Sequence, residues 1–272
     1  MSLRIQNNIE AFNAHRQLAG TSAQLSKAME RLASGYRINR AADDSAGLAI
    51  SEKLRAQIGG LMQAQRNAQD AISLVQTAEG AMQEVHAMLS RVRDLAVQFN
   101  NGTLSAADKT AITAEVAQLC AEIGRISSQT KFNGVSLLTG SATMTFQIGP
   151  DDGQTLTISA TNLFGSGASY AVDSNIFSFS GSSLLASLDT AIANVASARA
   201  NFGSVQNRLE HTINSLASYE ENLTASESRI RDVDMAAEMV NLTKLQILQQ
   251  AGTSMLAQAN ASPQSVLSLL RG

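Results

Sequence analysis

The sequence predicts a mainly α-helical protein, an elongated coiled-coil-like bundle with a small β-hairpin region and a pair of terminal helices. Apolar residues recur every seven positions along two long segments, which is typical of helices that pack side by side. Alanine, leucine and glutamine take the place of aromatic residues, which make up only 4% of the chain. Between the two segments the apolar period changes from helix-like to two, which indicates β-strands.

Composition limits the classes of function. The 272 residues allow one or two domains, and the only prolines are Pro150 and Pro263, so long helices are not interrupted. The net charge is −3 and no basic tract occurs, so we expect no nucleic-acid partner. Cys120 is the only cysteine, which excludes an internal disulfide, and its place beside an apolar helical pattern indicates packing.

The first part of the chain predicts an amphipathic helix and then a long helix over about 45–99. Gly35 is expected to end the first helix in the left-handed conformation, and Asp43 or Asp44 to cap the second. The first helix is expected to use Ile5, Ile9, Phe12, Leu18, Leu25, Met29 and Leu32. The heptad of the second consists of Leu54, Leu61, Ala68, Val75, Met82, Leu89 and Ala96. A second stripe contains Leu74, Ala78, Ala81, Val85, Met88, Val92, Leu95 and Phe99.

A shorter helix over about 105–128 and then β-hairpins are expected next. Asn133-Gly134 is a turn signal, and residues 143–159 alternate around a Gly-Pro-Asp-Asp-Gly turn. Phe177 and Phe179 are possible strand residues in a Ser- and Gly-rich stretch.

Helix is expected again from Leu184 to about Val233. Its heptad contains Leu188, Val195, Phe202, Leu209, Leu216, Leu223 and Ile230. We predict that this helix and the 45–99 helix pair antiparallel, with the shorter helix completing a bundle. Residues 44–235 would form this rod, with hairpins at about 135–183, and residues 1–43 and 236–272 a terminal helix pair.

Residues 245–270 carry no charged side chain, yet amide and hydroxyl residues lie between their apolar ones. Polar amides do not suit a lipid bilayer, so we expect no membrane span. The segment suits burial against other protein, and we infer that other copies of the chain cover it.

No arrangement of residues predicts catalysis, a cofactor or a metal site. His15, His86 and His211 are isolated in sequence, and no glycine-rich phosphate loop occurs. Capping and turn roles explain Asp43-Asp44 and Asp151-Asp152 better than acid–base chemistry does. We therefore expect no enzyme activity. Residues 1–17 lack a continuous apolar region, so we expect no cleaved secretory signal.

Both ends of the sequence resemble bacterial flagellins. Residues 31–58, RLASGYRINRAADDSAGLAISEKLRAQI, resemble the family's N-terminal signature. At the other end the similar segments are SRIRDVD at 228–234, QILQQAGTSMLAQAN at 246–260 and VLSLLR at 266–271. NGVSLL at 133–138 and FQIG at 146–149 resemble the central hairpin region.

The resemblance implies a fold, a function and partners. Flagellins pair their terminal helices in an inner tube, called D0, around which a helical layer with hairpins, called D1, is arranged, and no large outer domain is expected here. The protein would be the extracellular subunit of the flagellar filament, exported without a cleaved signal peptide. The implied partners are further copies, an export chaperone at about 241–270, and the filament cap and hook-junction proteins. The implied inner-tube residues are Ile5, Ile9, Phe12, Leu18, Leu25, Leu245, Leu248, Met255, Leu256, Val266, Leu269 and Leu270.

Two further sites follow from the same resemblance. Residues 89–97, LSRVRDLAV, are similar to the segment that innate immune receptors read in some flagellins, with Leu89, Arg91, Leu95 and Glu115 as matching residues. Ser90 and Leu119 differ from recognised members, which favours a filament contact or a salt bridge for Arg91. Possible O-glycosylation sites are Ser141, Ser159, Thr161, Ser166 and Ser169, although solvated turns are the favoured interpretation of these residues.

Two alternatives remain beside a filament subunit. A hook–filament junction protein of the same apparatus would share the terminal helices. A helical binding adaptor would use the heptads to hold another partner.

Overall fold

The computed structural model describes residues 8–139, 143–159 and 184–271, with side chains up to residue 261. The chain divides into two compact units. The terminal unit is Met1–Ala56 with Asn222–Gly272, and the central unit is Gln57–Glu221. Phe177 and Phe179 lie outside the described residues.

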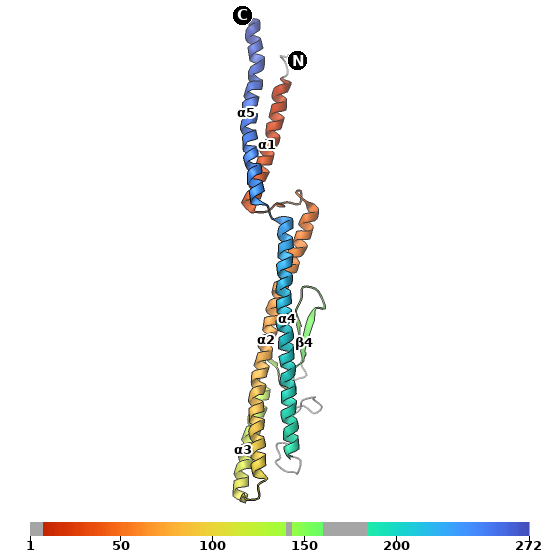
Figure 1. Cartoon of the computed structure of the whole chain (residues 1–272), viewed down its shortest axis with the longest axis vertical. Coiled ribbons are helices and arrows are strands. Elements are labelled where there is room, and N and C mark those ends of the chain that lie inside the picture. The colour runs from red at the N-terminus through yellow and green to blue at the C-terminus, as the bar shows by residue number, and fades with distance from the viewer. Residues whose placement is uncertain (1–7, 140–142, 160–183, 272) are drawn as a thin grey trace. The chain divides into compact units, whose positions relative to one another are not determined.

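Three helices form the central unit, namely α2 (Ser45–Phe99), α3 (Ala106–Gln129) and α4 (Leu184–Arg231), of which α2 and α4 also extend into the terminal unit. Figure 1 shows α3 and α4 lying along α2. Ion pairs fix the antiparallel direction of α2 and α4, because Arg93 Nε lies 2.6 Å from Asp189 Oδ1 and Arg199 Nη2 lies 3.5 Å from Glu79 Oε1. The antiparallel pairing predicted from the sequence is therefore confirmed for this unit.

The predicted heptads form the core of the central unit. The buried members on α2 and α4 are Leu61, Ala68, Val75, Met82, Leu89, Ala96, Leu188, Val195, Phe202, Leu209 and Leu216. α3 adds Ile112, Val116, Cys120 and Ile123. Because alanines such as Ala71, Ala78, Ala191 and Ala198 are also buried, the helices can approach closely without large side chains between them.

Local sequence explains where these helices begin. Asp44 Oδ1 accepts a 2.9 Å hydrogen bond from the Gly47 amide at the start of α2, so Asp44 rather than Asp43 is its N-terminal capping residue. At α3, Ser105 and Asp108 form a reciprocal capping box. Hydrogen bonds from Ser105 lower the pKa of the Asp108 carboxyl below its usual value.

Two small antiparallel hairpins pack on the central unit. β1 (Lys131–Phe132) pairs with β2 (Val135–Ser136), and their turn has φ values of 46° at Asn133 and 82° at Gly134, as a type I′ turn requires. β3 (Thr143–Gln147) pairs with β4 (Thr155–Ser159), which turns Leu156 and Ile158 into the core. The Asn67 side chain of α2 donates a 2.9 Å hydrogen bond to the Gln147 carbonyl, which fixes the second hairpin on α2.

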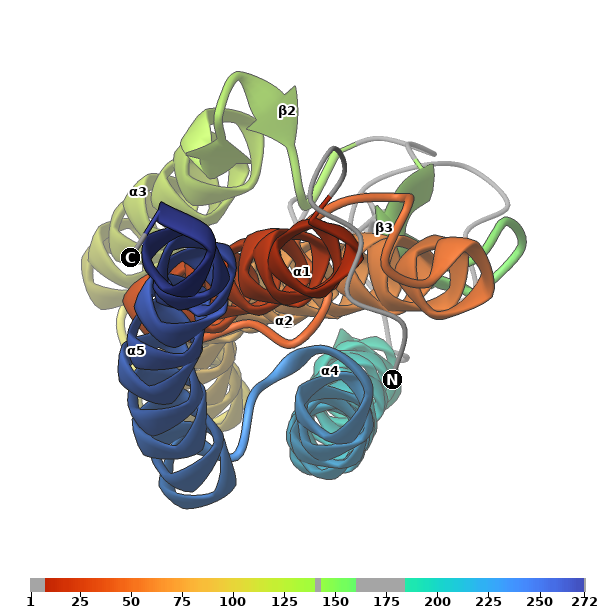
Figure 2. The ribbon, with the colours of Figure 1, turned by 90° about the horizontal axis from the view of Figure 1, so that it is seen from above.

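Two helices dominate the terminal unit, namely α1 (Ile9–Ser34) and α5 (Met235–Arg271). Asn8 caps α1 by accepting a hydrogen bond from Ala11 N. Gly35 ends α1 with φ of 75°, as the sequence predicted. Two views agree that α1 and α5 lie side by side (Figures 1 and 2).

The central core predicts which substitutions destabilise this unit. Leu188→Ala removes a side chain with 0% exposure, and the resulting cavity is expected to lower the free energy of unfolding by about 2–5 kcal/mol. Val97→Ala is the control on an exposed position, with an expected change within about 0.5 kcal/mol. Denaturant unfolding followed by circular dichroism measures both, and equal losses would contradict the assigned core.

Candidate assembly surfaces of the terminal helices

α1 and α5 form an antiparallel seam with contacts at both ends. At one end Asn8 Nδ2 donates a 2.7 Å hydrogen bond to the Ala259 carbonyl, and at the other Arg31 Nη1 lies 3.9 Å from Glu238 Oε2. Between these contacts, the less exposed residues recur at spacings of three and four, as in a coiled coil. They are Ala11, Ala14, Leu18, Thr21, Leu25, Ala28 and Leu32 on α1, and Leu242, Leu245, Gln249, Gly252, Leu256 and Ala259 on α5.

Large and small residues alternate across this seam. Leu18 packs directly on Gly252, where a Cβ atom would lie 3.2 Å from Leu18 Cδ1. Thr21 and Gln249, next along the same faces, make the middle of the seam polar. Only Ala28 and Leu245 are fully buried among these positions, so the pair holds few large apolar contacts of its own.

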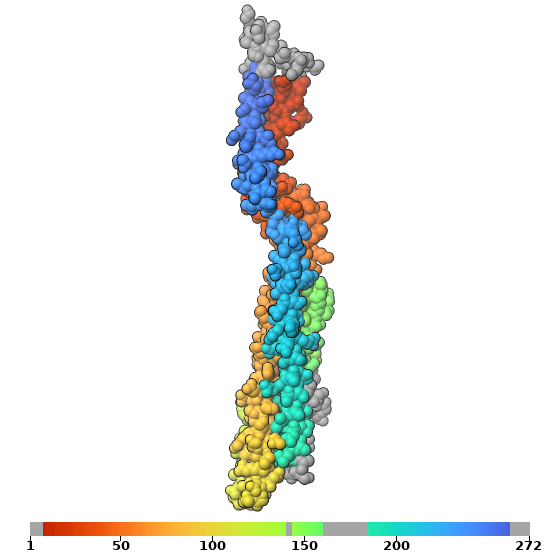
Figure 3. All heavy atoms as spheres, viewed as in Figure 1, coloured from red at the N-terminus to blue at the C-terminus, as the bar shows by residue number. Residues whose placement is uncertain are grey.

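Outside the seam, both helices expose large apolar side chains. Phe12 is 70% exposed, Val240 71% and Met255 65%. The full set in the described part of these helices is Ile9, Phe12, Met29, Met235, Met239, Val240, Ile247, Leu248 and Met255, which we call the outer face. A shallow groove on α5, lined by Met239, Val240, Thr243, Lys244 and Ile247, belongs to it. Figure 3 shows α5 lying against α1, with the outward side of α5 uncovered in that view.

The residues predicted for self-assembly divide between these two faces. Leu18, Leu25, Leu245 and Leu256 lie in the seam within one chain. Ile9, Phe12, Leu248 and Met255 lie on the outer face. Ile5 lies outside the described residues, as do the side chains of Val266, Leu269 and Leu270. Sequence analysis missed Met239 and Val240, although their apolar character a few residues before the charge-free segment was a usable signal.

The predicted receptor or filament-contact residues are partly exposed and partly buried. Arg91 donates from Nε and Nη2 to Glu115 Oε1 at 3.1 and 2.8 Å, and both side chains are exposed on neighbouring helices. Leu89 and Leu95 are buried, with 0% and 2% exposure. Their side chains belong to the core of the central unit, so the expectation that they contact a partner at the surface is corrected here.

Of the predicted glycosylation residues, Ser159 belongs to the described part of the chain. Ser159 is exposed at the end of β4. Ser141, Thr161, Ser166 and Ser169 lie outside the described residues.

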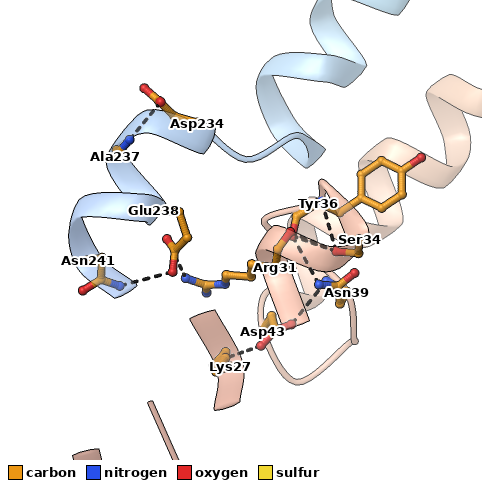
Figure 4. A network of polar contacts seen from close by, with 10 residues as sticks. All are labelled: Lys27, Arg31, Ser34, Tyr36, Asn39, Asp43, Asp234, Ala237, Glu238 and Asn241. Carbon is orange, nitrogen blue, oxygen red and sulfur yellow. Dashed lines mark hydrogen bonds and ion pairs between the residues drawn. The ribbon is translucent and has the colours of Figure 1, made fainter. Parts of the chain in front are cut away.

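A polar network joins α1, α5 and the segment between α1 and α2 (Figure 4). Lys27 Nζ of α1 lies 2.6 Å from Asp43 Oδ1, while Asp43 Oδ2 accepts hydrogen bonds of 3.2 Å from the Asn39 and Arg40 amides. Asp234 accepts from the Ala236 and Ala237 amides and thereby caps α5.

Asp43 is the most strongly perturbed carboxyl of this network. The hydrogen bond from Lys27 and those from the Arg40 and Asn39 amides lower the pKa of Asp43 from 3.8 to about 2. The group stays ionised through neutral and mildly acidic pH and holds the α1–α2 connection against Lys27.

The remaining candidates for chemistry have structural explanations. Burial raises the pKa of the Cys120 thiol to about 11, so this residue packs as a small apolar group rather than reacting as a thiolate. His86 is half-buried, and its Nδ1 atom has no hydrogen-bond partner among the described residues. In the same part of the chain, His, Cys, Asp and Glu side chains nowhere gather in threes that suit a metal ion. None of the described helices is long and apolar enough to cross a lipid bilayer.

Comparison with known proteins agrees with this architecture. Residues 5–143 match the bacterial flagellin N-terminal helical region and residues 185–270 the C-terminal helical region. The chain is 49% identical to a flagellin of Halalkalibacterium halodurans over 98% of its own length and 99% of the relative's. It is 46% identical to a flagellar filament 33 kDa core protein of Treponema phagedenis, covering 98% and 99%. The crystal structure of Bacillus cereus flagellin is 34% identical, with a TM-score of 0.49 over 60% of this chain and 94% of that one.

The paired terminal helices, the bundle and the hairpins, with an uncovered apolar face, define a helical structural protein of the self-assembling class. The two family matches together extend over most of its length. The chain belongs to the bacterial flagellin family.

The titration of Asp43 is directly measurable. Because its pKa in the folded chain lies below the unfolded value, its stabilising contribution is present above pH about 4 and is lost as the pH falls through about 2. Carboxyl carbon NMR shifts are expected to give a midpoint near pH 2, and Lys27→Ala to raise the pKa towards 3.8. The matched control is Lys53→Ala, an exposed lysine, and a wild-type midpoint near 3.8 would contradict the network.

The Leu18–Gly252 contact predicts a size constraint on the seam. Gly252→Leu is expected to destabilise the α1–α5 pair by about 1–3 kcal/mol through overpacking. Leu18→Ala in the same chain is expected to restore part of the loss. Amide exchange along α5 measures the change. Gly20→Leu is the control, because nothing lies within 4 Å of its Cβ position, and a similar loss there would refute a specific contact.

Proposed function

We propose that this chain is the repeating structural subunit of a bacterial flagellar filament. The observation that carries the proposal is the outer face of α1 and α5, which one chain leaves exposed along both helices. A monomeric soluble protein rarely exposes so many large apolar side chains along one pair of helices. Relatives named as flagellins and filament core proteins, aligned over nearly their full length, support the same function.

Self-assembly explains both faces of the terminal pair. The seam holds α1 against α5, and neighbouring copies bury the outer face, which stabilises the assembly by about 25 cal/mol per Å² of apolar surface removed from water. Contacts between different patches on successive copies do not close into a ring and therefore generate a helical filament. In this proposal residues 1–43 and 236–272 form the inner layer, and residues 44–235 the surrounding layer.

The same function implies partners at defined segments. An export chaperone binds at about 241–270, where α5 carries its exposed apolar residues, and the cap and hook-junction proteins contact subunits at the two ends of the filament. The filament is extracellular, and the subunit reaches it without a cleaved signal peptide. In the free subunit the terminal helices open readily, because the few large contacts of the seam hold them only weakly.

The surface of the central unit supports a further role for the Arg91–Glu115 pair. Both side chains are exposed and hydrogen-bonded to each other, which suits a contact between copies in the filament. A host immune receptor is a second candidate partner for the same exposed pair. O-linked glycans at Ser141, Ser159, Thr161, Ser166 or Ser169 would also belong to the surrounding layer that residues 44–235 form in this proposal.

The hook–filament junction protein and the helical adaptor are less well supported. Full-length relatives bear the names of flagellin and filament core proteins, which favours the filament subunit over both. An adaptor would also need a partner for the heptads, and most of their residues are already buried within the central unit.

Charged substitutions on the outer face test the proposal. Ile247→Lys and Met255→Lys place an ammonium group where a neighbouring copy would bury the side chain, and each is expected to slow seeded elongation at least about tenfold. Sheared filaments of the same protein serve as seeds, and elongation is followed by electron microscopy. Gln250→Lys adds the same charge at an exposed position that is already polar and should elongate normally.

Deletion of Leu245–Gly272 separates assembly from folding. The truncated chain is expected to keep the unfolding transition of the central unit, whose core lies elsewhere, and to add no subunits to seeds. Elongation at the wild-type rate by the truncated chain, or by the Met255→Lys variant, would refute a role for these helices in assembly.

A further inference from the structure

The two connections that join the terminal helices to α2 and α4 are bonded to each other. Tyr36 and Asp232 form an isolated antiparallel bridge. On either side of it, the Arg37 amide donates to the Arg231 carbonyl at 2.7 Å and the Val233 amide donates to the Gly35 carbonyl at 3.0 Å. The segment after α1 and the segment before α5 are therefore paired through their main chains, within the terminal unit.

Arg231 lies at the centre of this joint. Its guanidinium carbon lies 4.9 Å from the centroid of the Tyr36 ring, and its Nη1 atom lies 2.6 Å from Glu52 Oε1 of α2. The side chain is only 13% exposed. One planar cation thus contacts the α1–α2 connection and the first part of α2 while its own main chain accepts the hydrogen bond from Arg37.

Neighbouring side chains add contacts around Arg231, but none of them makes the same contacts as Arg231. Arg37 Nη2 donates a 2.7 Å hydrogen bond to the Ile230 carbonyl. Arg55 reaches the Tyr36 hydroxyl at 3.4 Å and Glu227 at 3.9 Å, which are both long contacts. Among the described residues, Arg231 Nε and Glu227 Oε1 are buried without a hydrogen-bond partner. The joint therefore depends on few strong side-chain contacts. The two short ones run from Arg37 to the Ile230 carbonyl and from Arg231 to Glu52.

We propose that Arg231 is a positioning residue that locks the two connections together, so that α1 and α5 leave the joint as a pair in fixed register. The lock consists of the stack on Tyr36 and the ion pair with Glu52, and it holds the bridge at Tyr36 and Asp232 closed. Neither family resemblance nor heptad pattern assigns a role to this side chain.

The consequence for assembly rests on the proposed function. A joint that is closed before a subunit is added presents both terminal helices from one fixed point. If the joint is open, each helix is tethered separately, and the conformational entropy of both connections must be lost at the moment of addition. Opening the joint should therefore slow elongation even when the helices themselves are unchanged.

Amide exchange in the unassembled chain tests the lock without any filament. Arg231→Ala is expected to speed exchange of the Arg37 and Val233 amides about tenfold, as suits loss of a partly buried cation–π contact and an ion pair. The matched control is Arg229→Ala, because Arg229 lies in the same helical turn and is exposed. Within the described chain, its side chain contacts only Ser226 Oγ, at 3.3 Å. It should change exchange less than twofold.

Substitutions at Tyr36 separate the contribution of the ring, on which Arg231 stacks, from that of the Tyr36 hydroxyl. Tyr36→Phe keeps the ring and should leave exchange unchanged, whereas Tyr36→Leu should resemble Arg231→Ala. Arg231→Lys keeps the charge but loses the planar group, and an intermediate rate is expected. Exchange of amides within the central unit should be unaffected in every variant.

Seeded elongation then tests the consequence, with Arg231→Ala and Tyr36→Leu expected to be about tenfold slower than Arg229→Ala and Tyr36→Phe. Unprotected Arg37 and Val233 amides in the wild-type chain, or equal exchange in Arg231→Ala and Arg229→Ala, would overturn the lock. Failure of the wild-type chain to elongate would refute the proposed function and leave the exchange result standing. Fast exchange with normal elongation would overturn the link between the two.

Discussion

The structure of the terminal unit depends on one constraint, namely that α1 and α5 carry large apolar side chains both in their seam and outside it, and a single chain covers only those in the seam. The seam uses small and polar residues, such as Gly252, Thr21 and Gln249, and so leaves most large apolar side chains outside. A pair built in this way is cohesive enough to fix a register but gains little from apolar burial. Its remaining apolar surface favours association, and in the proposed function it drives the packing of neighbouring copies.

The central unit resolves the same problem within one chain. α2 also carries two apolar stripes, but α3, α4 and the hairpins cover both, so the large apolar residues of these stripes are buried or half-buried. The contrast between the units separates two roles: one unit folds on its own core, whereas the other reserves its apolar surface for neighbours. The hydrogen bond from Asn67 fixes the β3–β4 hairpin on α2, so the polar turn of this hairpin lies on the outside of the central unit.

Sequence reasoning predicted what depends on local period and capping. The bounds of α2, α3 and α4, the end of α1 at Gly35 and the I′ turn at Asn133 all follow from nearby residues, and the structure agrees closely. Periodicity placed Leu89 and Leu95 on packed stripes, and both are buried, whereas the family resemblance had offered them as surface contacts. Sequence reasoning failed where the answer depends on rotation about a helix axis: Leu18 and Phe12 appeared equivalent, although one lies in the seam and the other on the outer face. Arg231 could not be singled out, because its partners lie far away in sequence and meet it only through the folded connections.

The exposed methionines of α5 add a chemical consequence. Met235, Met239 and Met255 offer thioether sulfurs to solvent in the single chain, and oxidants convert such groups into polar sulfoxides. A sulfoxide oxygen on this surface would have to be desolvated when copies associate, which opposes packing. In the proposed filament, packed neighbours would exclude the oxidant from the same sulfurs. Chains awaiting incorporation would then be the redox-sensitive population, and each chain would become protected once others surround it.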